Sequence, residues 1–183
     1  MGGYKQYSPY NYMIFFTNNE NKLKETEQIL GIKLIKGFCA PQEIQSIHPE
    51  EVAKHKLNRI CVDGDCFINN YFVEDSGLYL GKDKEIGALI KWFTNDRIVK
   101  AYLGEEAIAV SCFCGYFNGV YNMFDGYVRG KIVKPRGTSG FGWDSIFEEE
   151  TTGKTFAEMT QEEKNKVSPR YLALMRMKQY LIK

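Results

Sequence analysis

Apolar and polar residues alternate along this chain in a way that predicts short buried strands followed by amphipathic helices. Residues 12–17 form an apolar run of the length of one buried strand, and Asn18-Asn19 ends it. A helix is expected over 20–30, because apolar residues recur there at helical spacing among charges and Gly31 follows. A strand, a turn and then a helix are typical of an α/β protein.

The same reasoning places the remaining elements. Asn118-Gly119 separates two long apolar-polar runs, and this dipeptide is the strongest short signal of a β-hairpin. Thr160 and Glu163 form a capping box, and Ser168-Pro169 is a favourable start for a last helix. The expected elements are strands at 32–35 and 71–73, a helix from Pro49, a helical segment at 86–93, a hairpin at 107–117 and 120–133, a helix from Thr160 to Val167, and a helix from Pro169 whose apolar face is Tyr171, Leu174, Met175 and Leu181.

Composition narrows the class of protein. The 183 residues fit one domain over 1–183, with a polar, tyrosine-rich lead at 1–11. Lys and Arg number 24 against 23 Asp and Glu, a formal charge of +1 that argues against nucleic acid as a partner. The five cysteines contain no Cys-x-x-Cys pair, and no apolar run is long enough to cross a membrane, so a cytoplasmic protein is expected.

Three cations stand at positions that a purely structural role does not favour. Lys56 lies within the apolar stripe of its helix, where its ammonium must either snorkel to solvent or meet an anion. Lys22 and Arg170 lie in the first turns of their helices. A cation there opposes the helix dipole unless an anion binds between the cation and the backbone amides of the helix. Free amides, dipole and Lys22 together would form a phosphate site.

Carboxylates follow a buried strand. Glu74-Asp75 ends the strand at 71–73, and in α/β sheets ligands bind at the carboxyl ends of strands. Because neighbouring side chains of a strand point to opposite faces, we expect only one of the two to reach a given site. The alternative is a pair of solvated loop carboxylates. Glu43 lies in a polar segment, and a magnesium ion is commonly bound by one or two acids together with substrate phosphates.

The glycine-rich loop (residues 135–144) combines three glycines with Phe141, Trp143 and Asp144. Glycine permits close approach of the backbone to a ligand, and an aromatic ring can stack on a nucleobase for roughly 1–3 kcal/mol. The alternative is a hairpin whose two rings fill the core.

Other local signals favour structural interpretations. Gly153-Lys154-Thr155 imitates the end of a phosphate-binding loop, but the preceding glutamates would repel phosphate, so a turn is expected. Cys112 and Cys114 lie on one face of a strand, as packing residues do.

Seven motifs in order carry a resemblance to a known family. They are Thr17-Asn18-Asn19-Glu20-Asn21-Lys22, Glu43-Ile44-Gln45, Val73-Glu74-Asp75-Ser76-Gly77, Ile90-Lys91-Trp92-Phe93, Pro135-Arg136-Gly137, Phe141-Gly142-Trp143-Asp144, and Lys164-Asn165 with Ser168-Pro169-Arg170. From about residue 15 to 181, the chain resembles the inosine triphosphate pyrophosphatase family. The resemblance implies an α/β fold with an elongated mixed sheet flanked by helices, in two lobes with a central substrate cleft.

The resemblance also implies roles for particular residues. Asp75 would accept the proton of the attacking water, and Mg²⁺ would be bound by Glu43, Asp75 and Glu74. The residues that would bind the triphosphate and nucleoside are Thr17, Asn19, Lys22, Lys56, Ser76, Lys91, Phe141, Gly142, Trp143, Asp144, Lys164 and Arg170.

The implied reaction is magnesium-dependent hydrolysis of deaminated purine nucleoside triphosphates (ITP, dITP, XTP) to the monophosphate and pyrophosphate, by a homodimer. Two departures from the family sequence bear on it. Asn18 replaces a glycine of the first motif, and Pro169 replaces a histidine that would contact the base. Two alternatives therefore stay open: an enzyme of relaxed or shifted base preference, and a nucleotide-binding protein without turnover.

Overall fold

A computed structural model describes residues 13–38, 41–62 and 70–182, so the predicted lead at 1–11 lies outside the described residues. In chain order the elements are β1 (Ile14–Phe16), α1 (Glu20–Leu30), β2 (Ile35–Lys36), α2 (Pro49–Val62), β3 (Asn70–Leu80), β4 (Glu85–Gly87), the 3₁₀ helix η1 (Ala88–Trp92), α3 (Asn95–Tyr102), β5 (Glu106–Phe117), β6 (Val120–Ile132), β7 (Phe147–Glu149), the 3₁₀ helix η2 (Phe156–Glu158), α4 (Gln161–Val167) and α5 (Pro169–Leu181).

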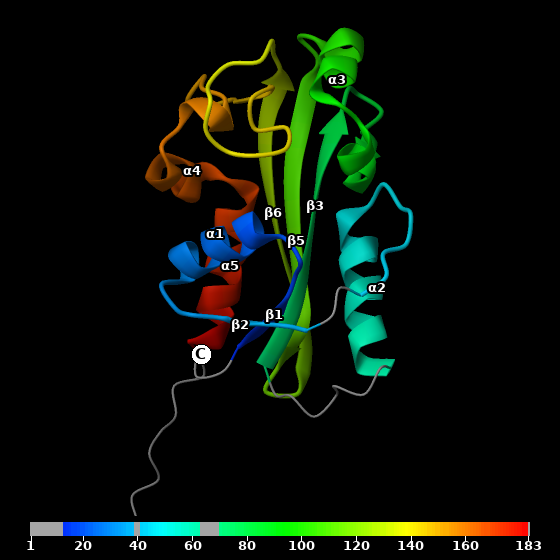
Figure 1. Ribbon diagram of the computed structural model, residues 1–183, viewed down its shortest axis with the longest axis vertical. Coiled ribbons are helices and arrows are strands. Elements are labelled where there is room, and N and C mark those ends of the chain that lie inside the picture. Colours follow the sequence, from blue (N-terminus) through cyan, green and yellow to red (C-terminus); the bar gives the residue numbers. More distant parts are fainter. Residues whose placement is uncertain (1–12, 39–40, 63–69, 183) are drawn as a thin grey trace, which may run out of the picture.

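The described strands form one mixed sheet in the order β2-β1-β3-β5-β6-β7, with β4 added beside β3. β1 pairs in parallel with β2 and β3, and the other pairs are antiparallel. The long strands β3, β5 and β6 give the sheet its elongated shape, with α1, α4 and α5 on one side, α2 on the other and α3 at one end (Figure 1). The predicted fold class, an elongated mixed sheet flanked by helices, is confirmed.

Separate hydrophobic clusters pack at the two ends of the long strands. One contains Leu80, Ala107 and Phe147 and is covered by α3 and η2. At the other end, Phe15 and Phe72 pack under α1 and α5, and a further cluster packs under α2 on the opposite face. The ends of the molecule thus have separate cores joined by continuous strands, and the region between them is where polar residues can be buried.

Most of the predicted elements are present. The helices that begin at Glu20 and Pro49 and the hairpin around Asn118-Gly119 are confirmed, and Gly31 ends α1 with a φ of 72°. Residues 86–93 are helical only as the 3₁₀ turn η1, after the short strand β4. The second strand is β2 at Ile35–Lys36 rather than 32–35, and α3 and β7 were not predicted. In α5, Ala173 and Met177 are buried in place of the predicted Tyr171 and Met175.

The prediction that a strand ends at Glu74-Asp75 is wrong, because β3 continues to Leu80. Its pairing with β5 is unbroken from Asn70 to Leu80, so ladder hydrogen bonds carry the strand through its polar residues. On its other edge β3 pairs with β1 only as far as Val73 and with β4 only from Leu78. Residues 74–77 therefore border a gap in the sheet between β1 and β4.

Candidate active site

A cleft of about 410 Å³ opens at this gap. It lies where β1 ends, where α1 begins and where η1 approaches β3. The residues predicted from the sequence that line it are Thr17, Asn19, Lys22, Glu43, Lys56, Glu74, Asp75, Ser76, Lys91, Gly142 and Trp143. The expectation that only one of Glu74 and Asp75 reaches a given site is wrong, because the open edge of β3 lets both border the same cleft.

The first turn of α1 forms one wall. Asn19 is the N-cap, and its Oδ1 accepts hydrogen bonds from the amides of Asn21 (3.0 Å) and Lys22 (3.1 Å). Thr17 Oγ1 accepts from the Asn19 amide at 3.1 Å. Two of the amides expected to be free are thus already capped, so an anion here would meet the helix dipole and the Lys22 ammonium. Asn18 is not among the described non-glycine residues with positive φ, so the turn does not require glycine there.

Glu74 points toward α1 and α5. Its carboxylate lies 2.5 Å from Lys22 Nζ, accepts a hydrogen bond from Ser111 Oγ at 2.7 Å, and pairs with Arg170 Nη2 at 3.1 Å. Burial alone would raise the pKa of Glu74, but the Lys22 and Arg170 cations outweigh it and lower this pKa to about 2. Glu74 is therefore a fixed anion that holds two cations in place.

Asp75 points the other way, toward α2. Its Oδ1 lies 2.8 Å from Lys56 Nζ, which also pairs with Glu43 Oε1 at 2.6 Å and donates to the Glu74 carbonyl oxygen at 3.1 Å. Of the two alternatives for Lys56, the structure shows the second: the ammonium meets anions instead of snorkelling. Lys91 pairs with the other oxygen of Glu43.

The two carboxyls that share Lys56 differ in acid strength. Burial raises the pKa of Asp75 more than Lys22 and Lys56 lower it, so the net shift is upward. Burial also favours a higher pKa for Glu43, but Lys56 and Lys91 outweigh this effect and lower the pKa of Glu43. Asp75 is thus the better proton acceptor of the two.

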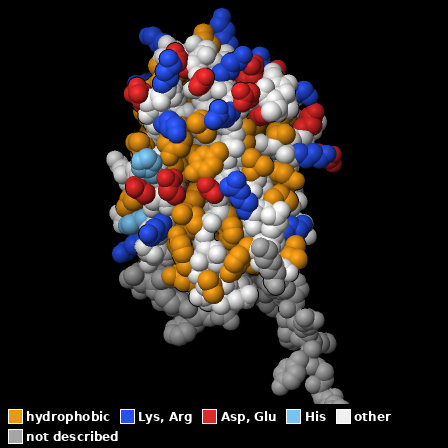
Figure 2. Space-filling model, turned by 180° about the vertical axis from the view of Figure 1, so that it is seen from behind, with side chains coloured by type: hydrophobic (Ala, Val, Ile, Leu, Met, Phe, Trp, Pro, Cys, Tyr) orange, Lys and Arg blue, Asp and Glu red, His pale blue; other side chains and the backbone are white. Residues whose placement is uncertain are grey.

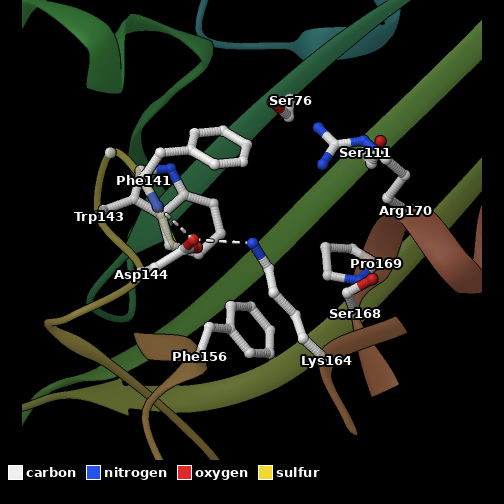
Figure 3. Close-up of a pocket in the computed structure, with 11 residues that line it drawn as sticks. Ser76, Ser111, Phe141, Trp143, Asp144, Phe156, Lys164, Ser168, Pro169 and Arg170 are labelled. Atoms are coloured by element: carbon white, nitrogen blue, oxygen red, sulfur yellow. Dashed lines mark hydrogen bonds and ion pairs between the residues drawn. The ribbon is translucent and has the colours of Figure 1, made fainter. Parts of the chain in front are cut away.

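A second, smaller cavity of about 50 Å³ adjoins the cleft and shares Ser76, Gly142 and Trp143 with it. We call it the aromatic pocket. Figure 3 shows its two sides: Phe141, Trp143 and Asp144 of the glycine-rich loop face Lys164, Pro169 and Arg170 of α4 and α5.

The two rings of the glycine-rich loop are half-buried. Trp143 also packs on the Phe147 and Phe156 rings, with centroids 5.6 and 6.0 Å away. Both interpretations of the rings therefore hold in part: Trp143 joins the core with one face and lines the pocket with another.

A buried charge cluster closes this pocket. Lys164 Nζ lies 2.7 Å from Asp144 Oδ2 and 2.9 Å from Glu25 Oε1, and 4.7 Å above the Phe141 ring. Asp144 Oδ2 also accepts the Phe141 amide at 2.8 Å, which fixes the loop (Figure 3). Glu25 pairs with Arg170 as well. The Arg170 guanidinium is buried between Glu25 and Glu74, and its Nε has no hydrogen-bond partner.

Sequence reasoning missed two residues of this region. Glu25 is buried on α1, one turn after Lys22, and its i, i+3 spacing from that cation is the signal that could have found it. Asn95, the first residue of α3, donates from Nδ2 to the Gly142 carbonyl oxygen at 3.0 Å. No motif marks Asn95, because its partner lies 47 residues away.

Three further expectations concern features outside the site. Cys112 and Cys114 are buried, and burial raises the pKa of each thiol, which fits the packing role expected of them. The turn lies at residues 150–152, directly before the expected Gly153-Lys154-Thr155, and Thr155 forms a β-bridge with Glu148. Within the described part of the chain, no helix has the length and apolar content that crossing a membrane requires.

Comparison with known proteins adds independent information. The model of the Ham1 family matches residues 13–180. The chain is 36% identical to the inosine triphosphate pyrophosphatase of Schizosaccharomyces pombe, over 92% of this chain and 94% of the relative. It is 38% identical to the inosine triphosphate pyrophosphatase of Neurospora crassa, over 92% of each. A solved HAM1 protein from Coxiella burnetii shares the fold, with a TM-score of 0.75 and 24% identity over 93% of this chain and 98% of that one.

Proposed function

The chain belongs to the Ham1 family, and from this we propose that it hydrolyses inosine triphosphate to inosine monophosphate and pyrophosphate. Like its curated relatives, it is a hydrolase of acid anhydrides. We extend the proposal to dITP and XTP, which share the 6-keto group of the base. The enzyme would remove deaminated purine nucleotides from the nucleotide pool, in the cytoplasm.

The observation that carries this proposal is the junction of the two cavities. The cleft brings together Lys22, Lys56 and Lys91, whereas the aromatic pocket offers Phe141 and Trp143. A nucleoside triphosphate has the same two parts, an anionic chain and a flat base. Its sugar would lie at the shared residues, beside Ser76.

Asp75 is the residue we assign to proton transfer. Its pKa is raised by burial, so it accepts a proton from water more readily than an ordinary aspartate does. The attacking oxygen would form a bond to the α-phosphorus while the bond to the bridging oxygen of pyrophosphate breaks, and the proton of the water passes to Asp75. The three lysines would stabilise charge on the phosphoryl oxygens.

Glu43 and Asp75 are suited to bind a magnesium ion. Both already place a carboxylate oxygen within 2.8 Å of one cation, the Lys56 ammonium, so they converge on a single point. Among the described residues no group of three His, Cys, Asp or Glu side chains could hold a metal, so a magnesium ion here would need further ligands from substrate phosphates. Glu74, the third predicted ligand, is engaged by Lys22 and Arg170 instead. When bound, magnesium would supply electrophilic stabilisation of the phosphate oxygens.

Base selection would depend on donors from Lys164 and Arg170. A 6-keto oxygen can accept a hydrogen bond, whereas the amino group of adenine at that position cannot, and polar pairing discriminates more strongly than shape. The pocket of about 50 Å³ is far below the roughly 300–1,000 Å³ of typical ligand sites, so its walls must separate to admit a base. Pro169 lines the pocket without any donor, and this favours the second candidate, an enzyme of broader base preference.

We also propose that the protein is a homodimer. The register pairs Met123 with Cys114 and Tyr127 with Val110, so both lie on the face of the sheet that α2 covers elsewhere. They are nevertheless 45% and 47% exposed. Figure 2 shows hydrophobic side chains gathered across the middle of the rear face of the molecule. Exposed apolar side chains gathered on one face are typical of an interface between protein chains.

A panel of triphosphates tests the function. Purified protein with Mg²⁺ is incubated with ITP, dITP, XTP, ATP and GTP, and released pyrophosphate is measured. The proposal expects pyrophosphate from the first three, and a comparable kcat/KM for ATP, whose base lacks the 6-keto oxygen, would establish the broader preference. Absence of pyrophosphate from every substrate would refute hydrolysis and leave the non-catalytic alternative.

A further inference from the structure

The cations and the acids of the cleft neutralise one another. Lys22 pairs with Glu74, Lys56 with Glu43 and Asp75, and Lys91 with Glu43, three charges of each sign. A triphosphate that approaches these six side chains meets no net positive charge. The net positive charge that attracts the triphosphate must therefore arise during binding, when a metal ion enters the cleft.

Lys56 is the centre of this arrangement. Its ammonium has acceptors at 2.6 Å (Glu43 Oε1), 2.8 Å (Asp75 Oδ1) and 3.1 Å (Glu74 carbonyl oxygen), which match its three hydrogens. The Lys56 side chain is only 10% exposed, so water could do little to solvate the ammonium if these acceptors were lost. No hydrogen is left for a phosphate, and the ammonium occupies the point on which the proposed magnesium ligands converge.

We propose that Lys56 is an internal counter-cation that makes the binding of the divalent metal and of the triphosphate depend on each other, an inference that rests on the proposed function. A metal that binds alone must take both carboxylates from the ammonium and leave a buried cation without a counter-ion. A triphosphate that binds alone must draw the ammonium away, which leaves Asp75 without its ion-pair partner and Glu43 with Lys91 alone. When both bind, the carboxylates take the metal and the ammonium takes a phosphate oxygen.

This exchange has a thermodynamic consequence. If the triphosphate improves metal affinity by some factor, the metal improves triphosphate affinity by the same factor. A neutral residue at position 56 removes the competitor for the carboxylates. Affinity for the metal alone should then rise, while the cooperative gain from the triphosphate should fall.

The experiment measures Mn²⁺ binding, followed as loss of the free-ion signal in electron paramagnetic resonance. It compares wild type, Lys56→Met, Lys56→Gln and the control Lys54→Met, each with and without the non-hydrolysable analogue α,β-methylene-ITP, and subtracts the Mn²⁺ that the analogue binds in the absence of protein. Lys54 lies on the same helix but is exposed, which makes it a matched control. We expect both Lys56 variants alone to bind Mn²⁺ about tenfold more tightly than wild type, and Lys54→Met to match wild type.

The analogue provides the second readout. It should tighten Mn²⁺ binding by about tenfold or more in wild type and by a several-fold smaller factor in the Lys56 variants. Equal Mn²⁺ affinity in wild type and Lys56→Gln, or Mn²⁺ binding to wild type that ignores the analogue, would overturn the inference. The wild-type measurement needs no variant to fold.

Failure of the inference and failure of the proposed function give different results. If wild type releases pyrophosphate from ITP while substitution of Lys56 leaves the Mn²⁺ affinity unchanged, the proposed function stands and the inference is refuted. If wild type releases no pyrophosphate from any triphosphate, the proposed function is refuted, whatever the Mn²⁺ affinities are.

Discussion

Two adjacent carboxylates of β3 differ in acid strength because alternate strand residues face different helices. Glu74 meets the Lys22 and Arg170 cations, which hold its pKa near 2 against the effect of burial. Burial prevails at Asp75 and raises its pKa, although Lys22 and Lys56 act to lower it. One strand thus supplies a permanent anion and a proton acceptor side by side, and the division follows from the period-two geometry of a strand.

Replacing Asp75 by asparagine should remove proton transfer while retaining the shape of the site. We expect kcat for ITP to fall by about 100-fold or more, while α,β-methylene-ITP still binds in calorimetry carried out without metal. Asp96→Asn, an exposed substitution at the start of α3, is the control and should match wild type. A rate near that of wild type in Asp75→Asn would show that another group accepts the proton.

Replacing Glu25 by glutamine should destabilise the protein and loosen the aromatic pocket. Lys164 and Arg170 would lose the anion between them, and removing one partner of a buried ion pair costs about 3 kcal/mol or more. Stability is measured by urea unfolding, and KM for ITP should rise. Exposed Glu162→Gln serves as the control.

This effect should depend on pH in a defined direction. Burial would raise the pKa of Glu25, but Arg170 and Lys164 outweigh it and lower the pKa below the usual value of 4.5. The contribution of Glu25 to stability is then fully present above pH 4.5 and is lost as the pH falls through the lowered value. The difference in unfolding free energy between wild type and Glu25→Gln should therefore shrink in acid, and a constant difference would contradict the ion-pair account.

The sequence marks one side of these charge pairs better than the other. Lys22, Lys56 and Arg170 stand out locally, because a cation in a first helical turn or an apolar stripe needs a reason. Glu25 does not stand out, since a glutamate inside a charged helix is unremarkable. Its partners lie 139 and 145 residues away, so only the folded chain brings them together.

Among the elements, the glycine-rich loop depends most directly on its residue types. Gly137 and Gly140 have φ values of 78° and 81°. A Cβ at Gly140 would lie 2.3 Å from Asp144 Oδ2, the oxygen that accepts the Phe141 amide and pairs with Lys164. The glycine therefore makes room for the carboxylate that anchors the loop and one wall of the pocket.

Gly140→Ala should displace Asp144 and so weaken nucleotide binding as well as stability. A left-handed backbone alone costs an alanine about 1–2 kcal/mol, and the contact with Asp144 adds to this. Gly153→Ala is the matched control, because Gly153 also has a positive φ, 65°, but open space around it. Both variants should unfold at lower temperature, whereas only Gly140→Ala should raise KM for ITP. An equal KM in the two would show that the anchor is dispensable.

Element prediction succeeded where local signals suffice and failed where pairing decides. Capping residues and Asn-Gly located α1, α4 and the β5–β6 hairpin. β7 has only 3 residues and forms because β6 offers an edge, and β3 extends past its apolar part because β5 runs beside it. The gap that brings Glu74 and Asp75 to one cleft is a product of these pairings and has no local signal.

Across the molecule, the site lies between the cores at the two ends of the long strands. α1 and α5 belong to one end, whereas the glycine-rich loop packs at the other, and Lys164 connects them through Glu25 and Asp144. Separation of the aromatic pocket's walls therefore means a movement of one end relative to the other. On the face of the sheet that α2 covers, no helix of the described chain covers β6. There we expect the second copy of the chain to bind.

Introducing charge on the uncovered face should separate the proposed dimer. Met123→Glu and Tyr127→Glu place carboxylates on exposed positions of β6, so the fold should tolerate them while an apolar interface would not. We expect wild type to have the mass of a dimer by light scattering and the variants that of a monomer. Leu103→Glu, on an exposed residue that follows α3, is the control and should remain dimeric. A monomeric wild type would refute the proposal.

The spacing of the charge cluster along the chain has a consequence for synthesis on the ribosome. Glu25, Glu74 and Asp144 are translated before Lys164 and Arg170, the cations that they hold in the finished fold. Glu74 already has Lys22, but until α4 and α5 have emerged Glu25 and Asp144 must stay solvated or take up protons, and the nascent chain cannot seal its interior around them. α5 thus completes the site after the acids have been made, which should keep a chain that has not yet reached α5 from acting on nucleotides.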